Sequence, residues 1–116
     1  MTLKAYQNTQ RITEDPRQTE YRLFGQVTGA LIDAQKKSAK GGSLVEAIDW
    51  NRRMWRTLAA DCLDDRNQLP QEVRANIISL SLWVTKYSKQ VTRQGAPLDP
   101  LISINRTIME GLRGAA

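Results

Sequence analysis

The chain has 116 residues, a net charge of +5, one cysteine and no histidine. This length is typical of one domain, the single Cys62 excludes an internal disulfide, and the lack of histidine removes the usual general base and the commonest transition-metal ligand. We therefore expect one domain over residues 1–116, and we expect that it is not an enzyme and holds no metal ion or cofactor, although carboxylate or lysine chemistry remains open.

Helix signals begin close to the N-terminus. Residues 3 to 12 predict a short helix with apolar side chains on one side. Asp15-Pro16 then places a capping oxygen before a proline at the first helical position. A long helix is predicted from there to residue 36 or 37, before Gly41-Gly42 ends it.

Two further long helices follow in the middle of the chain. Ser43 with Glu46 three residues later has the spacing of a capping box, which predicts a helix from Ser43 to about Asp64. Pro70 begins the next predicted helix, and Gly95 and Pro97 end it.

The last helix begins with Asp99-Pro100, which repeats the first start signal, and it runs to about residue 112. The predicted core faces are Phe24, Val27, Leu31 and Ala34 in the first long helix; Leu44, Ile48, Met54, Trp55, Leu58 and Cys62 in the second; Val73, Ile77, Leu80, Val84, Tyr87 and Val91 in the third; and Leu101, Ile104, Ile108 and Leu112 in the fourth. Short connections between amphipathic helices predict an all-α bundle of four main helices, with the short N-terminal helix as a fifth.

Two glycines in the first long helix suggest a surface that another backbone approaches. Gly25 and Gly29 lie nearly opposite that helix's core stripe, beside Ile32. Each costs ~1 kcal/mol relative to alanine inside a helix. We expect either a helix of this chain, such as residues 3 to 12, or a partner helix against this surface; glycines without a role are the third alternative.

Three large apolar residues are poorly explained by a simple bundle. Ile78 and Leu82 project opposite the main seam of the third helix, and Trp50 lies well away from the centre of its helix's apolar face. Uneven packing of four or five helices would bury them. The functional interpretation is that they anchor a protein partner on an exposed apolar surface.

The positive charge raises nucleic acid as an alternative ligand. Arg52, Arg53 and Arg56 cluster on one side of the second long helix. Asp49, three and four residues before the first two, would pair with them as an ordinary surface acid, and no nucleic-acid motif accompanies the cluster. We therefore do not expect nucleic acid to be the main partner.

Several stretches together resemble one protein family. They are "EYRLFGQVTGALIDA", "AIDWNRRMWRTLAADC", "LISINRTIMEGLRG", "SLSLWVTKYS" and a tyrosine near the N-terminus, Tyr6. Taken in their order along the chain, they resemble the FlaF family of flagellar biosynthesis proteins. The resemblance implies a nonenzymatic helical protein that is required for flagellin production and export, acts alongside the regulator FlbT and binds flagellin.

From this resemblance we expect a flagellin-binding chaperone or adaptor that uses helix-in-groove contacts. The family pattern assigns no contact residues. Two alternatives remain: a regulator that binds flagellin messenger RNA through the arginine cluster, and a structural module that self-associates. The chain lacks a membrane-length apolar run and a secretory signal pattern, so we expect no membrane insertion and a cytoplasmic location.

Overall fold

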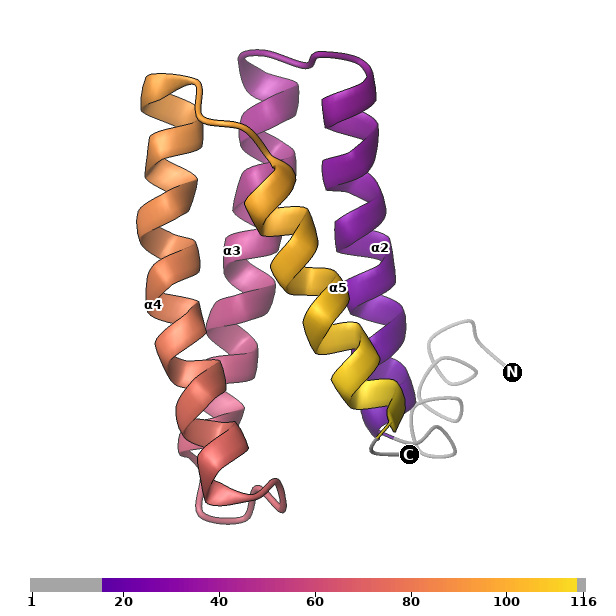
Figure 1. The fold of residues 1–116 in the computed structure, drawn as a ribbon, viewed down its shortest axis with the longest axis vertical. Helices are drawn as coiled ribbons and strands as arrows, with labels where there is room; N and C mark the ends of the chain where they lie inside the picture. Colours follow the sequence, from indigo (N-terminus) through magenta and orange to yellow (C-terminus); the bar gives the residue numbers. More distant parts are fainter. Residues whose placement is uncertain (1–15, 115–116) are drawn as a thin grey trace, which may run out of the picture.

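The computed structural model describes residues 16–114. Its helices are α2 (Pro16–Lys36), α3 (Gly42–Leu63), α4 (Gln71–Gln94) and α5 (Asp99–Gly114), and this range contains no strand. The four helices run alternately up and down, with α5 crossing in front of α3 (Figure 1). The predicted all-α bundle of four main helices is thus confirmed. The helix predicted at residues 3–12 lies outside the described residues.

The helix ends follow the predicted proline and glycine signals at most positions. Pro16 begins α2, and Pro70 immediately precedes α4. At the end of α4, Gly95 takes the left-handed conformation with φ 70°, and its N–H donates to the Val91 carbonyl. The Ala96 N–H donates to the Gln90 carbonyl, which completes a Schellman-type end.

The capping box predicted at Ser43 is wrong. Helix α3 begins at Gly42, and Gly41 is the N-cap, with φ 64° and no side-chain cap. Ser43 lies inside the first turn, where its hydroxyl donates to the Lys40 carbonyl at 3.4 Å. The two glycines turn the chain into the helix one residue early, so the Ser43 oxygen cannot accept an N–H as a cap.

The apolar core lies between all four helices, and α4 contributes Ile77, Val84 and Val91 to it. The whole predicted stripe of α2 is buried, and so is most of the predicted face of α3. Phe24 of α2 meets Trp55 of α3 edge to face, with ring centroids 5.7 Å apart. Cys62 is also buried, and burial raises the pKa of its thiol.

A group of buried polar side chains, here called the polar hub, joins three helices within this core. It consists of Thr28 of α2, Asn51 and Trp55 of α3 and Asn105 of α5. Trp55 Nε1 donates to Asn105 Oδ1 at 2.8 Å. Asn105 Nδ2 donates to Asn51 Oδ1 at 2.8 Å and to Thr28 Oγ1 at 3.1 Å. Because these bonds are directional, the polar hub fixes the position of α5 on α2 and α3.

The buried seam of α4 differs from the predicted one. Ile77, Val84 and Val91 are buried as expected, but Val73 is 40% exposed and the prediction of its burial is wrong. Ser81 is buried instead and its hydroxyl donates to the Trp55 carbonyl at 3.4 Å. The side of α4 that packs on α3 therefore includes small polar residues, and part of the predicted apolar stripe points away from α3.

Arg74 connects the start of α4 to the end of α3 by hydrogen bonds. Its Nε donates to the Cys62 carbonyl at 2.8 Å, and its Nη2 donates to the Asp64 carbonyl at 2.9 Å. These bonds satisfy two of the carbonyls that a helix end leaves open. In the same loop, Arg66 lies 2.8 Å from the Asp64 carboxylate, and its hydrogen bonds lower the pKa of Asp64.

Candidate protein-binding site

Helices α4 and α5 are close at their connection and separate along their length. Tyr87 of α4 donates its hydroxyl to the Pro97 carbonyl at 2.6 Å, beside the start of α5. Burial and the nearby Asp99 raise the pKa of Tyr87. The other half of α5 leans on α2, where Met109 lies near Gly25. Figure 1 shows the axes of α4 and α5 diverging away from their connection, and the two helices are not among the closely packed helix pairs.

The side of α4 that faces α5 is apolar. Val73, Leu80 and Tyr87 follow one another at intervals of seven residues and so share one side of the helix. The hydrogen bond of Tyr87 to Pro97 directs this side toward α5. Trp83, one turn before Tyr87, stacks on it with ring centroids 5.1 Å apart and remains 37% exposed.

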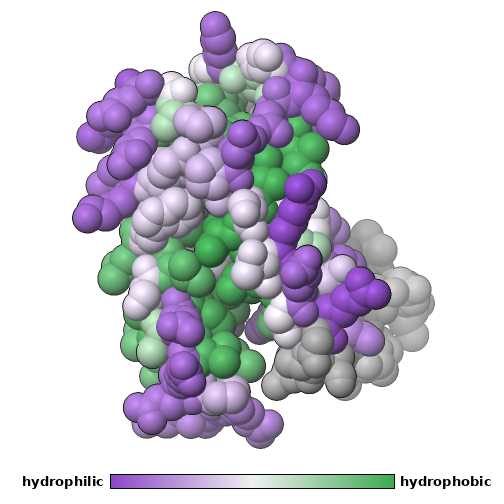
Figure 2. All heavy atoms as spheres, viewed as in Figure 1, coloured by the Kyte–Doolittle hydropathy of each residue, from purple (hydrophilic) through white to green (hydrophobic). Residues whose placement is uncertain are grey.

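The facing side of α5 carries two isoleucines. Asn105 and Met109 mark the side of α5 that is packed on α2 and α3. Ile104 and Ile108 lie on the other flank and are only half-buried. Figure 2 shows continuous hydrophobic surface between the two helices on this side of the molecule. We call it the α4/α5 face and define it by Val73, Leu80, Trp83, Tyr87, Ile104 and Ile108.

The residues predicted around the two glycines lie on the side of α2 that α5 covers in part. A Cβ at Gly25 would meet the Met109 methyl at 3.6 Å, so α5 is the helix that approaches there. Gly29 is exposed, and a Cβ at this position would meet no neighbouring atom within 4 Å among the described residues. Ile32 is half-buried against the core beside α5. Partner contact at these three residues remains a prediction.

The predicted apolar anchors do not form one surface. Trp50 is half-exposed and lies between α2 and α3, where it lines two clefts with volumes of 270 and 470 Å³. Leu82 is 68% exposed on the outer side of α4. Ile78, one turn earlier, is half-buried and packs against the core. Burial by uneven helix packing, the alternative considered for all three residues, therefore fits Ile78 best. The role of Trp50, Ile78 and Leu82 as anchors for a partner remains a prediction.

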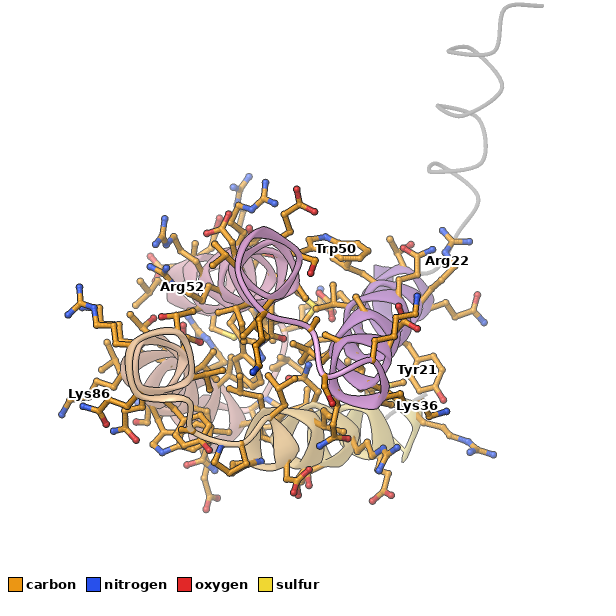
Figure 3. The ribbon with its side chains drawn as sticks, turned by 90° about the horizontal axis from the view of Figure 1, so that it is seen from above. Tyr21, Arg22, Lys36, Trp50, Arg52 and Lys86 are labelled. Carbon is orange, nitrogen blue, oxygen red and sulfur yellow. The ribbon has the colours of Figure 1, made fainter. Side chains whose placement is uncertain are left out.

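The arginine cluster is divided between two sides of α3. Figure 3 shows Arg52 on the side toward α4 and Trp50 on the side toward α2. Arg53 lines the same cleft as Trp50 and pairs with Asp49 at 3.3 Å. Arg56 is exposed. Nucleic-acid binding by Arg52, Arg53 and Arg56 remains a prediction.

Sequence reasoning missed the α4/α5 face because it assigned most of its residues to the core. One signal in the sequence indicated a second surface: the last helix carries apolar side chains on two flanks. One flank has Ile102 and Met109, and the other has Ile104 and Ile108. One neighbouring helix can cover only one of these flanks. Among residues 16–114, no three histidine, cysteine or acidic side chains are placed to hold a metal ion. Within the same range, no helix is both long and apolar enough to cross a membrane.

The chain matches a protein-family model over nearly its whole length. The model is described as flagellar protein FlaF, and the match extends over residues 2–112. No curated protein and no solved structure matches the chain significantly.

Proposed function

Because the chain belongs to the FlaF family of flagellar proteins, we propose that it serves flagellin production and export by binding flagellin as a chaperone or adaptor. The family is a flagellar one and not a family of enzymes. The observation that supports the proposal is the α4/α5 face, an apolar surface that residues 16–114 leave partly exposed.

The shape and chemistry of the α4/α5 face suit an amphipathic helix. A partner helix could lie along the apolar flanks of these two diverging helices, and helix-in-groove binding uses apolar anchors at helical spacing. Trp83 is the strongest candidate anchor because tryptophan is enriched among the residues that dominate binding energy. Its stacking on Tyr87 holds the ring in place before a partner arrives.

A chaperone that covers an amphipathic flagellin segment would keep that segment from assembling before export. The same apolar surface would be buried in the complex, and each large side chain that becomes buried contributes roughly 1.5–3 kcal/mol. FlbT is a second candidate partner in this proposal. Self-association through the α4/α5 face is the competing explanation, and it predicts a dimer without flagellin.

Binding of purified flagellin, held monomeric, tests the proposal. We compare Val73→Glu and Trp83→Glu with the matched control Leu82→Glu, which adds the same charge to the outer side of the same helix. The first two variants should weaken binding by tenfold or more, because a hot-spot loss is roughly 2 kcal/mol or larger, and Leu82→Glu should bind as the parent does.

Three results would contradict the assignment of flagellin binding to the α4/α5 face. Equal binding by all three variants would remove the α4/α5 face from the contact. A selective loss in Leu82→Glu would instead support the contact predicted at Leu82. A stable dimer that dissociates in Trp83→Glu and binds no flagellin would show that the surface serves self-association, which light scattering of the protein alone detects.

A further inference from the structure

A small pocket lies between α3 and α4, on the flank of α4 away from the α4/α5 face. Its volume is 160 Å³. Arg52 of α3 and Ser88 and Lys89 of α4 supply its donor groups, and Val45 and Asp49 of α3 lie on its wall. Figure 3 shows Arg52 extending from α3 on this flank.

Two donors that line this pocket are buried without partners. Ser88 is 1% exposed, and its hydroxyl has no hydrogen-bond partner among the described residues. The Nε of Arg52 is likewise buried and unpartnered within residues 16–114. A helical serine often donates to the carbonyl one turn back, as Thr92 does here to the Ser88 carbonyl at 3.2 Å. Buried donors without acceptors cost free energy, so an acceptor placed in the pocket would be stabilised by both.

The charges around the pocket favour an anion with a single charge. Arg52 and Lys89 contribute two positive charges to the lining. Asp49 contributes one negative charge, although it is also paired with Arg53 at 3.3 Å. The net charge of the lining is therefore +1, which one carboxylate neutralises and a doubly charged phosphate exceeds.

The apolar part of the wall favours a carboxylate on a short aliphatic stem. Val45 is half-exposed beside the donors, where the methylene groups of an acidic side chain would lie against it. A guanidinium presents its N–H groups as a fork that matches two carboxylate oxygens, and the Ser88 hydroxyl would add one more hydrogen bond.

We propose that this pocket binds the carboxylate of an aspartate or glutamate side chain presented by a protein partner. The proposal is independent of the α4/α5 face, because the two sites lie on different flanks of α4. It also gives Arg52 a role that its neighbour Arg53 does not share, since Arg53 lines the cleft beside Trp50 and pairs with Asp49.

Nuclear magnetic resonance of the ¹⁵N-labelled full chain tests the proposal. The probes are the capped pentapeptide Ala-Ala-Glu-Ala-Ala, its counterpart with Gln in place of Glu, and inorganic phosphate, all at equal ionic strength. The Glu peptide should cause a saturable shift of the Arg52 Nε–H signal. The Gln peptide should bind more weakly by about tenfold or more, as expected for the loss of hydrogen bonds to a charged group. Equal shifts with both peptides, or tighter binding of phosphate than of the Glu peptide, would overturn the proposal.

Matched arginine variants give the second arm. Arg52→Gln should weaken binding of the Glu peptide by about tenfold or more, whereas Arg56→Gln, at an exposed arginine of α3 that does not line the pocket, should leave the affinity within about twofold of the parent. An equal loss in both would mean general attraction to a basic surface and would overturn the site. If Arg52→Gln does not fold, Lys89→Gln is the deciding variant, because Lys89 is exposed and its substitution should not disturb the fold. Lys89→Gln should lower the affinity for the Glu peptide several-fold. An unchanged affinity would count against the proposal.

Discussion

The sharpest test of the fold is the substitution Asn105→Ala at the centre of the polar hub. Its side chain accepts one hydrogen bond and donates two, and it is fully buried. Removal leaves Trp55 Nε1 without its acceptor and Asn51 Oδ1 without its donor. Each buried group without a partner costs about 1–3 kcal/mol, and the cavity left by the shorter side chain adds to this sum.

We therefore expect Asn105→Ala to lower the free energy of unfolding by about 3–5 kcal/mol, which is a large share of the ~5–15 kcal/mol typical of a domain. For a chain of this size the loss corresponds to a fall in Tm of roughly 10–20 °C. Urea unfolding followed by circular dichroism measures it. Thr107→Ala on the same helix is the control, because Thr107 is exposed and donates only to the Ser103 carbonyl of its own helix.

The control should stay within about 0.5 kcal/mol of the parent. A double-mutant cycle of Asn105→Ala with Trp55→Phe should show a coupling of about 1 kcal/mol or more, because both changes remove the same hydrogen bond. A loss below about 1 kcal/mol for Asn105→Ala, with an unchanged denaturant slope, would refute the view that the polar hub holds α5 in place.

Further outcomes follow from single positions. Gly29→Ala should raise the free energy of unfolding by about 1 kcal/mol, since the site is helical and open, whereas Gly95→Ala should lower it by about 1–2 kcal/mol because its φ is 70°; urea unfolding compares them. The lowered pKa of Asp64 means that its pairing with Arg66 stabilises the fold above the unfolded pKa and is lost as the pH falls through the folded pKa. Asp64→Asn should therefore flatten stability against pH in acid, and an unchanged slope would argue against this pairing. Cys62 should resist a thiol reagent in the folded protein, because burial raises its pKa, and react once urea unfolds it; rapid labelling without urea would contradict its burial.

The helices and most of their ends were predictable from the sequence because their signals are local. Pro16, Gly95 and Asp99 act on the backbone within one turn, and the stripe from Phe24 to Ala34 repeats at helical spacing. The N-cap predicted at Ser43 was wrong because a capping pattern does not show at which residue the chain turns into the helix. Here Gly41 is the N-cap.

The polar hub and the candidate sites depend on packing between distant segments. Asn51 and Asn105 look like surface residues in a hydropathy pattern, and only their contact across three helices makes their burial favourable. The exposure of Trp83 depends in the same way on where α5 lies. The pocket at Arg52 and Ser88 needs two helices in register, which no spacing within one of them reveals.

The polar hub also bears on why residues 16–114 leave the α4/α5 face partly exposed. An apolar bundle gains by closing over its own hydrophobic surface, so α5 would be drawn toward α4 if only nonpolar contacts held it. Such a slide would break the bonds from Asn105 to Thr28, Asn51 and Trp55, each of which is buried away from water. The buried amide thereby opposes collapse, and a partner helix would meet a preorganised apolar surface without first having to open it.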